Sequence, residues 1–66
     1  MPIVTISIFE GRSVDQKRAL IEGVTDVVCD VTGNVPEAVN VIIEEKSREN
    51  WAMGRQLGID RPRVGR

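Results

Sequence analysis

The chain begins with the stretch that decides its fold, Met1-Pro2-Ile3-Val4-Thr5-Ile6-Ser7-Ile8-Phe9-Glu10-Gly11-Arg12. β-Branched and aromatic residues fill it as far as Phe9, and the Glu-Gly-Arg that follows is typical of a tight turn. The pattern predicts a strand that runs from the N-terminus into this turn. Because side chains alternate along a strand, Val4, Ile6 and Ile8 share one apolar face that suits a core.

Pro2 stands directly after Met1, and its small side chain is of the kind that permits removal of the initiator methionine. A purely structural reason for it exists, since proline lacks an N–H and is tolerated at the first residue of a strand. A processed chain would also present a secondary amine. An α-amine titrates near ~8, so burial or a nearby cation such as Arg12 would have to lower its pKa before it served as a base at neutral pH.

A long helix is predicted after the turn. Ser13 followed by Gln16 is a capping-box signature, and Gly33 suits the left-handed position at a helix C-terminus, with Pro36 just beyond. Between these signals, apolar residues recur at helical spacing: Leu20, Ile21, Val24, Val27, Val28 and Val31. Cys29 lies off this apolar stripe in no thiolate-activating motif, which favours a reduced bystander over a nucleophile.

A second strand is predicted at residues 39–45, where Val39, Val41 and Ile43 share a face. Strand, helix and strand form a β-α-β unit, so the two strands should be parallel and the helix should cover one face of the sheet. The other face then requires a second copy of the chain. After a polar turn at 47–50, residues 51–59 contain two glycines and predict a short hairpin or an extended arm. The fold class is therefore α+β.

Length and composition favour self-association. A chain of 66 residues usually needs disulfides, a metal or copies of itself for stability. The single Cys29 forms no internal disulfide, and a sequence without His offers no cluster of zinc-type ligands. The hydrophobic fraction of 41% is generous for so short a chain. We therefore expect a homo-oligomer without a zinc-type metal site.

The net charge of −1 provides no global field for nucleic acid or for an anionic membrane. The N-terminus lacks the pattern of an export signal, and no stretch has the ~20 apolar residues of a membrane span. With a reduced Cys29, these features favour a cytoplasmic protein. Residues 61–66 are basic and rich in Gly and Pro, which is typical of a frayed tail.

Taken together, the motifs resemble the 4-oxalocrotonate tautomerase family over roughly residues 2–59. The resemblance rests on the Pro2 strand, on Glu10-Gly11-Arg12-Ser13, on Asp15-Gln16-Lys17, on Val39-Asn40-Val41-Ile42-Ile43-Glu44-Glu45 and on Asn50-Trp51-Ala52-Met53-Gly54. The order of these motifs, their spacing and the total length of the chain support the resemblance together. It implies one tautomerase-like domain at residues 2–60, followed by the tail at 61–66.

The resemblance implies a β-α-β protomer with a C-terminal hairpin, commonly a hexamer, whose site is built from more than one subunit. Pro2 would be the general base that interconverts enol and ketone in a small 2-hydroxy or 2-oxo unsaturated acid, without a cofactor. Arg12 would grip a substrate carboxylate, for which a guanidinium offers a fixed fork of donors. Trp51 would be the apolar wall of the pocket, in place of the more usual Phe.

One departure concerns the family's second arginine, which falls at Asn40. An amide brings no charge to a developing oxyanion, a contribution of ~3 kcal/mol per donor in well-studied sites. Activity on a diacid is therefore in doubt, and Arg55 is an alternative source of charge, although a solvated surface arginine is the favoured interpretation. Dehalogenating members that resemble this chain carry an arginine at the position of Phe9 and a water-activating glutamate at the position of Met53. Their replacement disfavours hydrolytic dehalogenation.

Two classes of function remain open. The first is an isomerase with Pro2 and Arg12 as catalytic residues and with Asn40 and Trp51 contacting a small carboxylate substrate. The second is a tautomerase-like subunit with weak or no activity, which pairs with a paralogous chain in a hetero-oligomer or binds a small ligand. Intact Pro2 and Arg12 favour the first, whereas Asn40 favours the second.

Overall fold

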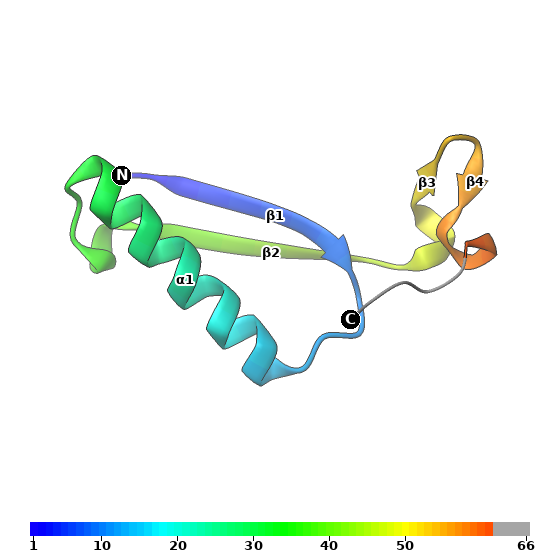
Figure 1. Ribbon diagram of the computed structural model, residues 1–66, viewed down its shortest axis with the longest axis horizontal. Helices are drawn as coiled ribbons and strands as arrows, with labels where there is room; N and C mark the ends of the chain where they lie inside the picture. The colour runs from blue at the N-terminus through cyan, green and yellow to red at the C-terminus, as the bar shows by residue number, and fades with distance from the viewer. Residues whose placement is uncertain (62–66) are drawn as a thin grey trace.

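The computed structural model describes residues 1–61 (Figure 1). Its strands are β1 (Ile3–Phe9), β2 (Asn40–Lys46), β3 (Ala52–Met53) and β4 (Gln56–Leu57), and its helix is α1 (Val14–Thr32). Three single turns of 3₁₀ helix complete it: η1 (Pro36–Ala38), η2 (Arg48–Asn50) and η3 (Gly58–Asp60). Apart from Arg61, the expected basic tail at 61–66 lies outside the described residues.

β1 and β2 pair in parallel over seven residues each, with Ile3 opposite Asn40 and Phe9 opposite Lys46. β3 and β4 form a separate antiparallel hairpin. The prediction of a β-α-β protomer with parallel strands, one long helix and a C-terminal hairpin is confirmed. β2 begins at Asn40, one residue later than expected, because the Asn40 N–H makes the first bond of the ladder, to the Pro2 carbonyl at 2.9 Å.

The two ends of α1 are fixed by the residues that the sequence indicates. The Gln16 N–H donates to Ser13 Oγ at 3.1 Å, and the Ser13 N–H donates to Gln16 Oε1 at 2.9 Å, which completes the capping box. At the other end Gly33 adopts a φ of 77° and donates its N–H to the Cys29 carbonyl. The helix therefore has the length needed to run back along β1.

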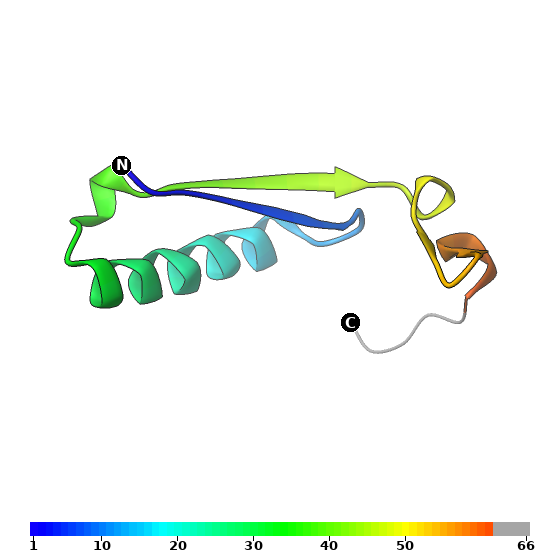
Figure 2. The same ribbon diagram turned by 90° about the horizontal axis from the view of Figure 1, so that it is seen from above.

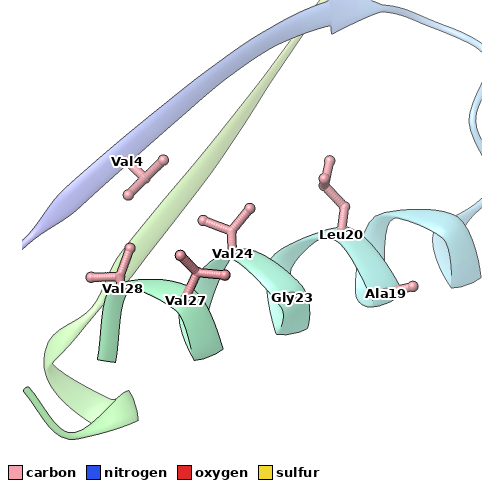
Figure 3. A pocket seen from close by; sticks show the side chains of 7 residues that line it. All are labelled: Val4, Ala19, Leu20, Gly23, Val24, Val27 and Val28. Atoms are coloured by element: carbon pink, nitrogen blue, oxygen red, sulfur yellow. The ribbon is translucent and has the colours of Figure 1, made fainter. Parts of the chain in front are cut away.

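Helix α1 covers one face of the two-stranded sheet and leaves the other uncovered (Figure 2). Leu20, Val24 and Val28 point from the helix toward β1 (Figure 3), and a 2.9 Å ion pair joins Lys17 to Glu45. Seven apolar residues line a groove of about 540 Å³ between helix and strand: Val4, Ala19, Leu20, Gly23, Val24, Val27 and Val28.

The apolar stripe is narrower in the protomer than its spacing predicts. Val27 is 63% and Val31 80% exposed, whereas Cys29, which is expected off the stripe, is half-buried. The helix axis crosses the sheet at an angle (Figure 1), so successive turns do not present the same positions to the strands.

The protomer contains no conventional core. Among residues 1–61 no apolar side chain is fully buried, and Ile3 and Ile42 lie exposed on the uncovered face. The radius of gyration is 14.6 Å, against about 11 Å for a compact domain of this length. Within this range no helix is both long and apolar enough to cross a membrane.

We expect Gly33→Ala to destabilise the protein by about 1 kcal/mol, because its positive φ is unfavourable for a residue with a Cβ. No atom lies within 4 Å of the position that this Cβ would occupy, so the cost is one of backbone conformation alone. Urea denaturation at fixed protein concentration measures it. Gly33→Asn is the matched control, since Asn tolerates this conformation; equal losses in both variants would contradict the explanation.

Cys29 should react slowly with alkylating reagents at neutral pH. Desolvation at its half-buried position, reinforced by the negative charges of Asp26, Asp30 and Glu37, raises the pKa of its thiol. Because the thiolate is the nucleophile, the iodoacetamide rate should rise with pH through a midpoint above that of the same thiol in the urea-unfolded chain. A folded-state midpoint at or below the unfolded one would contradict this prediction.

Candidate active site

Pro2 lies immediately before β1 and is half-buried. Its carbonyl accepts the 2.9 Å hydrogen bond from the Asn40 N–H, which fixes its backbone at the end of the sheet. Met1 is 88% exposed and contributes little packing. Removal of Met1 would therefore leave the position of Pro2 intact while it created the secondary amine.

Asn40 is the first residue of β2 and lies at the same end of the sheet as Pro2. It is exposed, as are Ile42 and Glu44, and these three residues share the strand face that is turned away from α1. The structure therefore brings together Pro2 and Asn40, two of the four predicted site residues.

Arg12 lies beyond the opposite end of β1, in the turn that leads into α1. Gly11 supplies the turn with a φ of 119°, and the Arg12 side chain is exposed. β1 has seven residues, which span roughly 20 Å. The structure therefore does not bring Arg12 to Pro2 within one copy of the chain.

Trp51 lies between η2 and β3, and the β3–β4 hairpin lies beyond the end of the sheet that is remote from the N-terminus (Figure 1). Trp51 is half-buried, and its ring packs against Phe9 with centroids 4.7 Å apart and the planes inclined at 54°. Phe9 ends β1, so Trp51 and Arg12 both lie near the C-terminal end of that strand. The structure places them together at one end and Pro2 with Asn40 at the other.

Arg55, the alternative source of charge, lies in the turn between β3 and β4. Gly54 and Arg55 have φ values of 58° and 73°, the left-handed pair that a tight two-residue hairpin turn requires. Arg55 is exposed at the hairpin end. Within one copy it is therefore remote from Asn40 and supplies no charge there.

Sequence reasoning missed Arg48, which it placed in a polar turn. The Arg48 guanidinium lies over the Phe9 ring, 4.6 Å from its centroid, and Nη2 donates to the Gly58 carbonyl at 2.9 Å. Phe9 is far from Arg48 in the sequence, so no local pattern could indicate this contact.

The four predicted site residues lie in two pairs at opposite ends of the protomer. One end has Pro2, which would offer an amine once Met1 is removed, with a neighbouring amide, and the other end has a guanidinium with an aromatic side chain. All four residues could therefore share a site only where ends of different copies meet. The groove beside α1 is no alternative, since its seven residues are apolar and cannot bind a carboxylate or transfer a proton. Within residues 1–61 no group of His, Cys, Asp and Glu is arranged to hold a metal ion.

Comparisons with known proteins agree with this fold. The family model described as tautomerase enzyme matches residues 2–59. The 2-hydroxymuconate tautomerase of Bacillus subtilis is 43% identical over 58 residues, which cover 86% of this chain and 94% of that protein.

Two solved structures show the same architecture. The 4-oxalocrotonate tautomerase homologue YwhB is 38% identical, with a TM-score of 0.86 over 92% of this chain and all of that one. A heterohexamer 4-oxalocrotonate tautomerase from Chloroflexus aurantiacus is 25% identical, with a TM-score of 0.86 over 91% of this chain and 97% of that one. On the extent of the family match and the identity to these relatives, the chain belongs to the tautomerase family of enzymes.

Proposed function

We propose that this chain is a cofactor-free keto–enol tautomerase of small 2-hydroxy or 2-oxo unsaturated carboxylic acids, with the Pro2 amine as general base. The neutral amine removes the proton from the 2-hydroxyl of a dienol and returns it to a carbon of the conjugated chain. The product is the 2-oxo acid, and the amine is neutral again. No redox partner is required, because one proton changes place and the double bonds shift.

The observation that carries the proposal is the position of Pro2. It is half-buried, it is held by the Asn40 backbone, and the family match begins at this residue and excludes Met1. A fixed amine is preorganised for proton transfer, and general-base catalysis contributes typically about 10²–10⁴-fold to a rate.

Arg12 and Trp51 complete the proposed site from another copy. The guanidinium would hold the substrate carboxylate, and Trp51 would exclude water from the amine and so favour its neutral form. The uncovered sheet face, with Ile3 and Ile42 exposed, supports assembly, and we favour a homohexamer. The functional unit is then the oligomer, and a lone protomer would be inactive.

Asn40 narrows the substrate class. A diacid places a second charge, or a strongly polarised carbonyl oxygen, where this chain has only an amide. The interaction lost is that between a cation and a developing oxyanion, which is among the larger contributions in such sites. We therefore propose a monoacid dienol as the better substrate.

A second candidate is a subunit with weak or no activity that assembles with a paralogous chain. Asn40 favours it, because a partner with arginine at this position would restore the missing charge. A hetero-hexameric relative shows that the fold permits such an assembly. Activity of the purified homo-oligomer distinguishes the two candidates.

Pro2→Ala and Arg12→Ala should each lower kcat/KM on a 2-hydroxydienoate roughly a hundredfold or more. Co-expression of the two variants should restore about a quarter of the wild-type activity. Pro2 is intact in one half of the randomly mixed subunits and Arg12 in the other half, and each site takes the two residues from different copies. About one site in four therefore contains both intact residues. Initial rates on the purified mixed assembly measure this, and intact mass verifies the loss of Met1.

The control is Arg18→Ala, which removes an exposed arginine that pairs with Asp15 and should leave the rate unchanged. Unaltered rates in both single variants would contradict the enzymatic proposal. Loss in each variant without recovery in the mixture would mean that Pro2 and Arg12 act within one copy.

Asn40→Arg should raise kcat/KM on a dicarboxylic dienol such as 2-hydroxymuconate by about tenfold or more, because the cation would bind the second carboxylate in addition to stabilising the developing oxyanion. The rate on a monoacid dienol should change less. Asn40→Gln, which keeps an uncharged amide, is the matched control and should bring no gain. A diacid rate that does not respond to arginine would show that position 40 does not face the substrate oxygen.

A further inference from the structure

We propose that Arg48 is a positioning residue for the active-site wall: it clamps Phe9 and the C-terminal hairpin so that Trp51 is held in place before substrate binds. This inference rests on the proposed function insofar as Trp51 forms the wall. No part of it requires Arg48 to touch the substrate.

The first half of the clamp is a stack of three side chains. The Arg48 guanidinium lies 4.6 Å from the centroid of the Phe9 ring, and the same ring contacts Trp51 at 4.7 Å. A cation over an aromatic ring is attracted by its quadrupole, and inclined aromatic pairs are themselves favourable. Phe9 is anchored as the last residue of β1, so the stack ties Trp51 to the sheet.

The second half is a pair of hydrogen bonds that links the Arg48 side chain to the Trp51 backbone through Gly58. Arg48 Nη2 donates to the Gly58 carbonyl at 2.9 Å, and the Gly58 N–H donates to the Trp51 carbonyl at 2.7 Å. The same Nη2 also reaches the Arg61 carbonyl, at 3.5 Å. Ring and backbone of Trp51 are thus both connected to Arg48, by independent routes.

Gly58 shows how closely the parts fit. It is the one buried residue among residues 1–61, and a Cβ there would lie 2.8 Å from the Arg48 carbonyl oxygen and 3.1 Å from Phe9 Cζ. Backbone cannot yield as a flexible side-chain end can. Only glycine therefore lets β4 and η3 approach the Phe9 ring this closely.

A clamp of this kind is needed because the hairpin has little else to hold it. β3 and β4 contain two residues each, and both strands are exposed in the protomer. The turn between them places Arg55, a residue with a Cβ, at a φ of 73°, which costs stability. Without Arg48, Trp51 would be held only by its ring contact with Phe9 and by the backbone hydrogen bond from Gly58 among the contacts described here.

Trp51 is the single tryptophan of the chain, so intrinsic fluorescence reports on it without interference. In Arg48→Met, which keeps the apolar stem and removes the cation and its donors, the acrylamide quenching constant should rise by about twofold or more. Because a misplacement of about 1 Å can cost 10²-fold in rate, we expect kcat/KM to fall at least tenfold. The acid limb of the rate profile should move to higher pH, since a looser wall leaves the amine better solvated and more basic.

Three further variants sharpen the test. Arg48→Lys keeps a cation and one donor, so quenching should lie nearer to wild type. Gly58→Ala opens the clamp from its other side and should reproduce the Arg48→Met quenching, which keeps the test decisive if Arg48→Met does not assemble. Arg18→Met, on the exposed surface of α1, is the matched control and should change neither quenching nor rate. Native mass spectrometry at equal concentration verifies the assembly.

Unchanged Trp51 quenching in assembled Arg48→Met would overturn the proposal, whatever the rates. Increased quenching with an unchanged rate and pH profile would overturn the assignment of Arg48 to the active site. A wild-type chain without tautomerase activity would contradict the proposed function instead, and quenching would still decide whether Arg48 holds Trp51.

Discussion

The parallel pairing of β1 with β2 is the constraint on which the rest of the structure depends. Parallel strands require a crossover, and α1 supplies it by running back along one face of the sheet. A single helix cannot cover both faces, so Ile3 and Ile42 remain exposed. The protomer consequently has no closed core, and burial of the second face must come from other copies.

The same pairing determines where the chemistry can occur. The first hydrogen bond of the ladder joins Pro2 to Asn40, whereas the last residues of the strands lead toward Arg12 and Trp51. A straight strand cannot bring its two ends together. Under the proposed function, catalysis and assembly are therefore one property, because a base and its carboxylate anchor meet only across subunits.

Local signals were sufficient to predict most of the fold from sequence. Ser13, Gln16 and Gly33 fix both ends of α1 through contacts with residues only a few positions away, and strict alternation sets the faces of the strands. The contact of Arg48 with Phe9 could not be predicted, because it joins distant segments and depends on the close approach of Gly58. The exposure of Val31 also escaped prediction, because it depends on the angle at which α1 crosses the sheet.

Because position 40 is asparagine where the resemblance predicts arginine, keeping the proposed Pro2 amine neutral depends more on the aromatic wall, Trp51. A basic amine is kept neutral either by a nearby cation or by desolvation. An arginine beside Pro2 would supply the first, but Asn40 supplies no charge, and the remaining cation, Arg12, must come from another copy. Under the proposed function, desolvation by Trp51 then has to contribute a larger share. A wall held by Arg48 and Phe9 before substrate binds would provide that contribution without the entropic cost of ordering the hairpin at each turnover.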